Sequence, residues 1–527
     1  MRDFQLPGRS SVFAQNGMCA TSHPLAAKVA VQILESGGNA VDAAIAAAVV
    51  LGICEPASTG IGGDCFALIK PAGEDRIVSL NGSGRAPQAL DAANLRAAGH
   101  KSMPLFNAPE AVTMPGAIDA FCRLSKDWGR IGLKASLAPA IYYADSGVPV
   151  GPRTAFDWKS AGERLTGDAR KYYLINSKPP KVGQIFQAPL QAEVLRKVAM
   201  KGRSGFYEGE IAKDMCDSLN ALGGVHTLDD FSNVACNYTD PISGTYKEVE
   251  LVEHPPNGQG ATALLMNSIL SEFDIAAMDP FGAQRAHIEA EASKLAYDAR
   301  DRFIADIDFA NRIDHMLDPL TAKKLAALID PKQAIAQVGR VTGAIHKDTV
   351  LLTVVDKDLM AVTMIYSIFH GFGSGLASKK FGINFQNRGA GFSLEDGHPN
   401  QAAGGKRPLH TIIPAMLRKD GRVIMPFGVM GGAYQPCGHA RLLSNMVDFG
   451  MHPQEALDGP RSFPDEGVLN VERGYTDVVR DQLADMGHRV EVPATPLGGA
   501  QAIRIDYENG VLEGATDPRK DGCALGY

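Results

Sequence analysis

The chain has 527 residues, of which 45% are hydrophobic and 21% charged, a composition typical of a globular protein with a large core. Its net charge of -7 supplies no basic surface, so we expect neither nucleic acid nor a membrane as a partner. The longest apolar stretch, residues 43–54, is too short to span a bilayer, and the first ten residues lack the apolar core of a signal peptide. We therefore predict a cytoplasmic protein that acts on a small molecule.

The eight cysteines are scattered, with no Cys-x-x-Cys pair and no metal-ligand spacing to histidine. They are predicted to be reduced and mostly buried, and we expect no metal. The glycine-rich stretch 371–375 lacks both a phosphate-loop lysine and Rossmann spacing, so it is interpreted as a turn. We expect no cofactor.

The first half of the chain is predicted to be rich in helices. A helix is expected over residues 24–35, with Ser22 as its cap, and an alanine-rich helix over residues 40–52 that packs closely against its neighbours. The charged residues of a long helix over 286–304 are expected to form a solvated face. Because no linker or repeat divides the chain, we expect one large unit or two interlocked lobes.

Strand and turn patterns dominate after residue 346. Residues 348–355 place a hydroxyl residue, Thr349, at the head of a strand that is apolar on both faces, and a hairpin partner follows at 361–368. Such a strand is typical of a sheet covered on both sides, with Thr349 at its rim.

Thr349 could become a new chain terminus. If the bond from Asp348 to Thr349 is cut, one residue supplies a nucleophilic hydroxyl and an amine that can act as its base. On the strand pattern alone, the simpler interpretation is a β-branched residue that opens an ordinary strand.

The paired glycines Gly431 and Gly432 also have two interpretations. Glycines after a strand let main-chain N–H groups approach a ligand closely, as an oxyanion hole requires. Alone they indicate a turn, but beside a terminal threonine they would complete a site for acyl transfer.

Seven sequence blocks, in order along nearly the whole chain, resemble the γ-glutamyltransferase family of N-terminal nucleophile hydrolases. They are S-H-P-L-A-A (22–27), G-G-N-A-V-D-A-A-I-A (37–46), E-P-A-S-T-G-I-G-G-D (55–64), M-P-G (114–116), F-Y-E-G-E-I-A (206–212), K-R-P-L-H-T-I-I-P-A (406–415) and the terminal A-T-D-P-R-x-x-G-x-A-x-G-Y.

The resemblance implies an α+β fold, a four-layer αββα sandwich with a helical lobe. It also implies a precursor that cleaves itself into a large subunit, 1–348, and a small subunit, 349–527, which stay together as a heterodimer. A further association of two heterodimers stays open. By position, Thr349 matches the family's nucleophile, Ser367 a second hydroxyl, Thr353 a neighbouring hydroxyl, and Gly431 and Gly432 the oxyanion-hole pair.

The chain departs from the family where relatives bind a γ-glutamyl group. Their carboxylate-binding arginine falls at Ser83, with Arg85 displaced by two positions, and His410 and Thr411 replace two serines. The positions that bind the α-amino group hold, in this chain, Phe369, Arg388 and Gly391.

Loss of an aspartate and gain of an arginine disfavour a cationic amino group. An anionic or neutral acyl group, held by Arg388, Arg85 or His410, fits better. These residues resemble those of the branch of the family that includes cephalosporin-acylase-like amide hydrolases.

The resemblance therefore implies a self-processing amidohydrolase or acyltransferase for a γ-glutamyl or related small acyl amide, with water or an amine as acceptor. The alternatives are an amidase for a non-glutamyl acidic acyl amide and a catalytically silent binding subunit. Retention of both hydroxyls and both glycines argues against the silent alternative.

Overall fold

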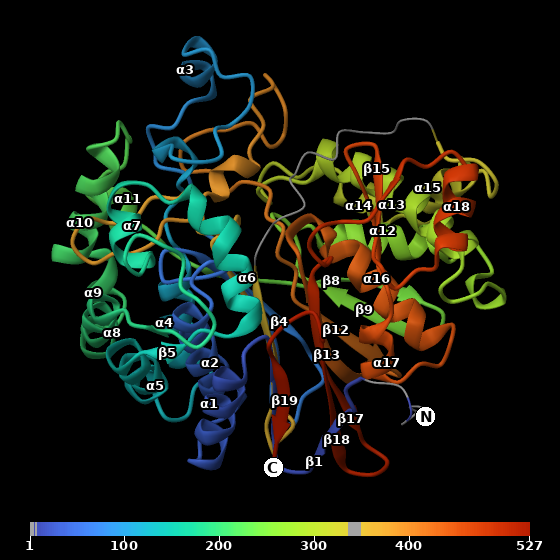
Figure 1. Cartoon of the computed structure of the whole chain (residues 1–527), viewed down its shortest axis with the longest axis horizontal. Helices are drawn as coiled ribbons and strands as arrows, with labels where there is room; N and C mark the ends of the chain where they lie inside the picture. Colours follow the sequence, from blue (N-terminus) through green and yellow to red (C-terminus); the bar gives the residue numbers. More distant parts are fainter. Residues whose placement is uncertain (1–4, 6–7, 336–348) are drawn as a thin grey trace.

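The computed structural model describes residue 5 and residues 8–335 and 349–527. Two seven-stranded sheets lie face to face, and helices cover the outer side of each sheet (Figure 1). This order of layers confirms the predicted α+β, four-layer αββα sandwich. Among the described residues, no helix combines the length and apolar character needed to cross a membrane.

One sheet, here called the β10 sheet, contains the predicted strand with Thr349 at its head. Its order is β19 (Cys523–Gly526), β2 (Met18–Thr21), β10 (Val350–Val355), β11 (Ala361–Ser367), β3 (Asp64–Lys70), β4 (Val78–Gly82) and β7 (Asn237–Thr239). The β13 sheet has the order β1 (Val12–Ala14), β18 (Val511–Thr516), β17 (Gly499–Asp506), β13 (Arg422–Met430), β12 (Ala415–Lys419), β9 (Val249–Glu253) and β8 (Ile242–Tyr246). Neighbouring strands in both sheets are antiparallel.

The strand β10 is buried on both faces, as its sequence predicts. The face toward the helices consists of Val350, Leu352 and Val354. The face toward the β13 sheet contains Leu351 and Val355, which belong to the cores between the sheets. Residues 361–367 form the predicted hairpin partner, β11, with Val350 opposite Tyr366. This register places the head of β10 beside the end of β11.

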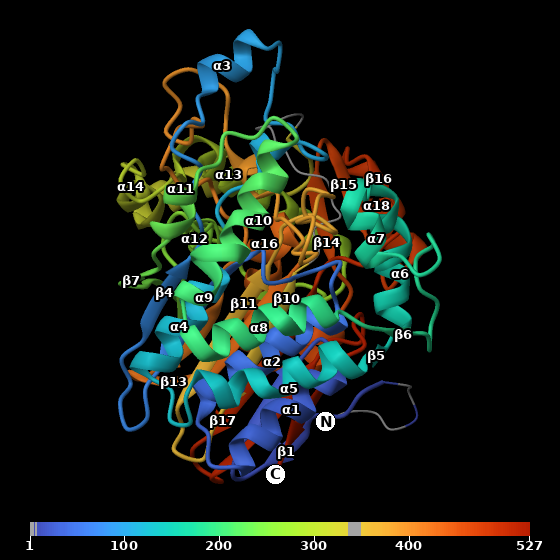
Figure 2. The same ribbon diagram turned by 90° about the vertical axis from the view of Figure 1, so that its left-hand side faces the viewer.

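Two layers of helices complete the sandwich. The β10 sheet is covered by α1 (Pro24–Glu35), α2 (Ala40–Cys54), α5 (Leu133–Ser146) and α8 (Pro189–Lys201), which face the viewer in Figure 2. The β13 sheet is covered by α12 (Gly260–Leu270), α13 (Ala283–Phe303) and α16 (Gln435–Val447). Every residue of α2 is buried. Its alanines permit close approach because they carry only a methyl group, as the sequence predicts.

The remaining elements surround this frame. The helices are α3 (Ala92–Ala97), α4 (Ala117–Asp127), α6 (Pro152–Ala161), α7 (Gly167–Tyr173), α9 (Ser204–Tyr207), α10 (Gly209–Asn220), α11 (Leu228–Ser232), α14 (Ile313–Leu317), α15 (Pro319–Ala326), α17 (Pro453–Asp458) and α18 (Asp477–Asp485). The short strands are β5 (Val148–Pro149), β6 (Ile185–Phe186), β14 (Ser462–Asp465), β15 (Val468–Val471) and β16 (Val490–Glu491). Helices α4 to α11 form the expected helical lobe on the side of the β10 sheet (Figure 1).

Two local predictions are wrong. The cap of α1 is His23, whose Nδ1 accepts a hydrogen bond from the Leu25 N–H, whereas the Ser22 hydroxyl donates to Glu55. The charged residues of the helix predicted over 286–304 do not form a solvated face, because Glu289, Glu291 and Arg300 are buried. The apolar cluster between α13, β15 and α18 covers one side of this helix, and its charges are paired within the protein.

The two sheets approach closely at Gly428 of β13, where an added Cβ would lie 2.9 Å from Leu351 Cδ1. We expect Gly428→Val to lower the free energy of unfolding by about 1–3 kcal/mol, because the extra methyl groups overpack the space between the sheets. Gly244→Val is the matched control, since the nearest atom there, Leu264 Cδ2, lies at an ordinary 3.4 Å. Urea unfolding of both variants measures the difference, and equal stabilities would contradict the prediction.

Candidate active site

Thr349 lies directly before β10 and is only 1% exposed. Its Oγ1 is 3.3 Å from the hydroxyl of Ser367, the last residue of β11. The pairing of β10 with β11 brings the two hydroxyls together across the ladder. Asp348, the residue before the expected cleavage point, lies outside the described residues.

The Ser367 hydroxyl is held by one main-chain donor and one side-chain donor. It accepts hydrogen bonds from the Phe369 N–H at 3.0 Å and from Arg388 Nη2 at 3.3 Å. A hydroxyl has one proton and two acceptor positions. With two N–H groups donating to its oxygen, Ser367 can direct its own proton to Thr349 Oγ1.

Arg388, at the start of a short 3₁₀ turn, is completely buried beside these hydroxyls. Its Nη1 donates to Thr411 Oγ1 at 2.9 Å, and its guanidinium lies over the Phe369 ring at 4.1 Å from the ring centre. Burial lowers the pKa of Arg388 to about 9, although nearby Asp64 opposes the shift. The guanidinium is therefore still a cation at neutral pH.

Phe369 has a φ of +81°, a left-handed conformation that side chains other than glycine rarely adopt. This conformation lets the Phe369 N–H point back to Ser367 while the ring supports Arg388. Such backbone strain is found most often at functional sites.

Asp64, which the sequence analysis did not single out, is a further buried charge of this site. It opens β3, opposite Ser367 in the ladder, and its Oδ2 accepts a hydrogen bond from His410 Nε2 at 3.1 Å. The sequence signal that could have identified Asp64 was its position between the G-I-G-G loop and an apolar strand. An ionisable residue at the head of a fully buried strand needs partners.

The environment shifts the pKa values of Asp64 and His410 in opposite directions. Burial raises the pKa of Asp64 to about 6, while Arg388 and hydrogen bonds from neighbouring groups partly offset this shift. Burial, followed by the charge of Arg388, holds the pKa of His410 well below its usual value. At neutral pH the site therefore contains an arginine cation, an aspartate anion and a neutral histidine.

Gly431 and Gly432 follow β13, with φ values of +117° and +58°. A Cβ on Gly431 would lie 2.8 Å from Gly498 Cα, so both conformation and space require glycine there. Met430, the preceding residue, packs with Leu351 between the sheets. The glycine pair thus begins at the end of the sandwich where β10 starts.

Gln259, a second residue that sequence reasoning missed, connects two parts of the site. Its Nε2 donates to the carbonyl oxygens of Gly432 at 2.9 Å and Thr411 at 2.7 Å. Its Oε1 accepts from Arg300 Nη1 at 3.2 Å. The sequence carries no signal for this role, because Gln259 is distant from both partners along the chain.

Two residues that the sequence analysis assigned to the site, Thr353 and Arg85, do not join the hydrogen-bond network around Thr349. Thr353 is fully buried, and its Oγ1 has no hydrogen-bond partner within the described part of the chain. Arg85 has a side chain that is 43% exposed, and it is paired with Asp306 at 3.0 Å and with the Gly405 carbonyl. The structure therefore does not bring Arg85 into the hydrogen-bond network of Thr349, Ser367 and Arg388.

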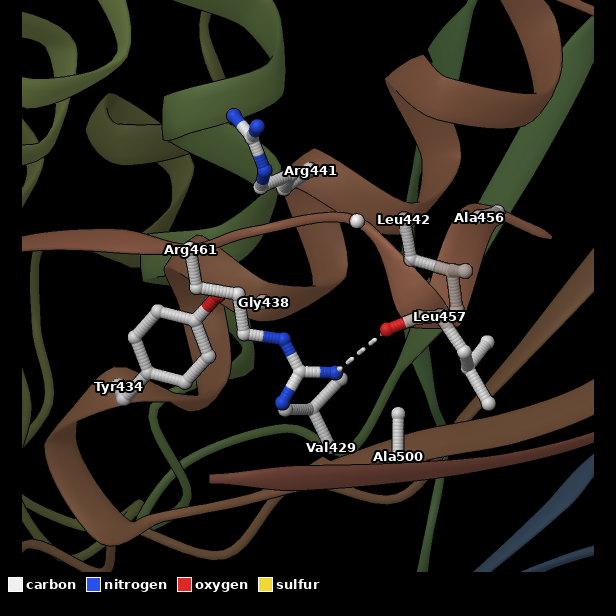
Figure 3. A pocket seen from close by; sticks show the side chains of 10 residues that line it. Val429, Tyr434, Gly438, Arg441, Leu442, Ala456, Leu457, Arg461 and Ala500 are labelled. Carbon is white, nitrogen blue, oxygen red and sulfur yellow. Dashed lines mark hydrogen bonds between the residues drawn. The ribbon is translucent and has the colours of Figure 1, made fainter. Parts of the chain in front are cut away.

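A small cavity lies on the helix side of β13 (Figure 3). Its volume of about 10 Å³ suits one water molecule rather than an acyl group. Its wall contains Val429, Arg441, Leu457 and Arg461, and none of Thr349, Ser367 and Arg388. We therefore do not assign substrate binding to it.

Three side chains with metal-ligating atoms, His287, Glu291 and His488, lie within 4.8 Å of one another. His287 Nδ1 and His488 Nε2 are 2.8 Å apart, a hydrogen-bond distance, and Lys294 donates to Glu291 at 2.7 Å. The Glu291 carboxylate is thus already paired with a cation of the protein. Because the cluster also bonds the main chain at Asp330 and Ile335, we interpret it as an anchor for residues 330–335.

The chain is similar to known proteins along nearly its whole length. The family model described as gamma-glutamyltranspeptidase matches residues 26–527. The chain is 36% identical to the glutathione hydrolase-like YwrD proenzyme of Bacillus subtilis, over 98% of this chain and 99% of that protein. It is 35% identical to the oxamate amidohydrolase proenzyme of Klebsiella pneumoniae, over 98% and 100%.

A solved structure shows the same fold. The crystal structure of cephalosporin acylase from Bacillus halodurans superimposes with a TM-score of 0.92 at 36% identity, covering 100% of this chain and 99% of that one. The match of a family model to nearly all of the sequence, together with this similarity in three dimensions, identifies the fold as that of the N-terminal nucleophile hydrolases. The chain belongs to the gamma-glutamyltranspeptidase family, whose members are amidohydrolases and acyltransferases.

Proposed function

We propose that this protein hydrolyses a small acyl amide, or transfers its acyl group, with Thr349 as the nucleophile. The observation that carries this proposal is the contact between the Thr349 and Ser367 hydroxyls at 3.3 Å, with Arg388 bonded to the second hydroxyl. The proposed nucleophile, the second hydroxyl and the arginine cation thus lie together at the rim of one sheet. Retention of this set argues against a catalytically silent subunit.

The first reaction is cleavage of the chain itself. Thr349 Oγ attacks the carbonyl carbon of Asp348, the bond to the Thr349 nitrogen breaks, and the acyl group passes to oxygen as an ester. The hydroxyl proton ends on the released amine, and water then hydrolyses the ester. The products are a fragment 1–348 and a fragment 349–527 whose first residue carries a free amine.

The arrangement of strands supports continued association of these fragments. In the β10 sheet, β10 pairs with β2 of the first fragment, and β11 pairs with β3. In the β13 sheet, β12 pairs with β9, and β18 pairs with β1. Breaking one peptide bond leaves all of these main-chain hydrogen bonds in place, so the mature protein is a heterodimer.

In each turnover the Thr349 amine takes the proton of its own hydroxyl as Oγ attacks the substrate carbonyl. The amine then gives that proton to the leaving nitrogen, and an acyl-enzyme ester forms. The N–H groups of Gly431 and Gly432 stabilise the oxyanion, a contribution of about 3–4 kcal/mol for each donor. Water or an amine releases the acyl group.

The acyl group is selected by Arg388. This buried cation, with the Thr411 hydroxyl beside it, favours an acyl group that carries a carboxylate and disfavours one that carries an ammonium. The names of two relatives, an oxamate amidohydrolase and a cephalosporin acylase, are consistent with such non-glutamyl substrates. A γ-glutamyl amide is the second candidate, because another relative is named glutathione hydrolase-like.

His410 is buried and neutral, and it is hydrogen-bonded to Asp64. Arg85 contacts Asp306 rather than the two hydroxyls. We therefore rank both residues below Arg388 for contact with the substrate.

The eight cysteines are all free, a pattern that fits a reducing compartment such as the cytoplasm.

Thr349→Ala should leave the chain uncut, because the attacking hydroxyl is gone. The wild-type protein should give two bands on a denaturing gel: sharing 56.0 kDa in proportion to 348 and 179 residues gives about 37 and 19 kDa. Thr349→Ser keeps a hydroxyl and should still be cut. A new amino terminus at Thr353 or Ser367 in the mature protein would disprove the assignment.

Arg388→Met should raise KM for oxamate by about 10- to 100-fold, because a charged hydrogen-bonding partner of the acyl carboxylate is lost. Ammonia release measures this reaction, and glutathione cleavage is measured in parallel. Arg461→Met is the matched control, since Arg461 is buried but lines the cavity behind β13. Efficient glutathione turnover that is unchanged in Arg388→Met would contradict the proposed acyl pocket.

Gln259→Met should lower kcat by about tenfold or more, because the Gly432 carbonyl loses its donor and the oxyanion-hole main chain loses its support. Gln454→Met is the control. Gln454 is equally buried and also bonds main-chain groups, those of Thr516, away from Thr349. The two variants should lose similar stability, but kcat should fall only in Gln259→Met.

A further inference from the structure

Asp64 is held firmly in one orientation. Its Oδ1 accepts hydrogen bonds from the N–H groups of Gly84 at 2.9 Å and Gly116 at 3.1 Å, and from Gln386 Nε2 at 2.9 Å. Its Oδ2 accepts from His410 Nε2. A carboxylate fixed by four donors keeps its charge at a constant distance from Arg388.

The charged and titratable groups around Asp64 come from several elements. They are Arg388, His410, Arg407, His254 and Cys65. His410 and His254 are neutral, because burial holds the pKa of each well below its usual value. Burial likewise keeps the Cys65 thiol protonated by raising its pKa. Arg407 donates to the carbonyls of Ser83 and Ala235 and to Asn237, so its guanidinium is occupied within the protein.

The N–H groups of Arg388 have fewer partners among the described residues than those of Arg407. Its two hydrogen-bond partners are the neutral hydroxyls of Ser367 and Thr411, and its Nε has no partner within the described part of the chain. Asp64 acts on this guanidinium through its charge rather than through a direct hydrogen bond. The cation is therefore balanced at longer range and keeps hydrogen-bonding capacity for an incoming carboxylate.

We propose that Asp64 is a specificity-determining residue, the counter-charge that limits how strongly Arg388 favours anionic acyl groups. This inference rests on the proposed function and deepens it. Asp64 attracts the guanidinium and repels an acyl carboxylate, so the two residues together set the charge that the substrate experiences. Asp64 touches none of the reacting atoms and acts through Arg388.

The test uses three small amides of similar size that all release ammonia: oxamate with charge −1, neutral oxamide and cationic glycinamide. Asp64→Asn removes a negative charge and leaves Arg388 unbalanced. KM should fall about tenfold for oxamate, stay within about twofold for oxamide, and rise for glycinamide. A residue with a purely structural role would change all three values in the same direction, and that result would overturn the inference.

The same charge can be removed from the wild-type enzyme by pH. The pKa of Asp64 is raised to about 6, so its carboxylate is protonated and neutral below that pH. KM for oxamate, which stays an anion in this range, should fall as the pH drops through about 6, while KM for oxamide should not follow. Asp64→Asn should lack this dependence. An oxamate KM with the same pH profile as oxamide would contradict the inference even if the variant failed to fold.

Two further variants separate charge from folding. Asp356→Asn is the matched control: Asp356 is a buried carboxylate that accepts three main-chain hydrogen bonds at the far end of β10. It should leave the ratio of the oxamate and oxamide KM values unchanged. In Arg388→Met, adding Asp64→Asn should no longer lower KM for oxamate. If wild-type enzyme cleaves neither these amides nor glutathione, the proposed function fails; if it cleaves the amides and these ratios do not move, only the inference fails.

Discussion

The site depends on one constraint, the antiparallel pairing of β10 with β11 inside a sandwich that covers both of their faces. The pairing places Thr349 opposite Ser367, and the burial of β10 on both sides prevents the strand from slipping by one residue. Such a slip would exchange the inter-sheet side chains with those that contact the helices. The 3.3 Å contact between the two hydroxyls therefore follows from the core rather than from local preferences of either residue.

A second constraint is the burial of charge close to that contact. Removing Arg388 from water is unfavourable unless its N–H groups find partners. The described part of the chain offers it two hydroxyls, an aromatic face and a nearby carboxylate, but not a direct ion pair. Elsewhere, buried arginines such as Arg285 on α13 contact a carboxylate directly, with Glu289 at 2.9 Å. This difference is consistent with the proposed role of Arg388 in binding the acyl group, whereas Arg285 is paired within the fold.

The strand order also explains how a chain could survive a break in its backbone at the site. Both sheets contain strands from before and after residue 348, and strands from the two parts of the chain pair with each other in each sheet, as β10 does with β2 and β12 with β9. The core between the sheets also combines residues from both parts of the chain, such as Leu68 and Met416. Cleavage would change the chemistry of Thr349 while leaving the packing around it intact.

The sequence by itself determined the elements with strong local patterns: the alanine-rich α2, the doubly apolar β10, its partner β11 and the glycine pair after β13. Their periodicity and glycine content are local properties, and the resemblance to a family supplied the sandwich and the order of its residues. Only the tertiary structure decided the roles of Asp64 and Gln259, the separation of Arg85 from Arg388, and the burial of the charges on α13. Those features arise from contacts between residues far apart along the chain, where electrostatics and packing depend on the folded arrangement and leave no local pattern.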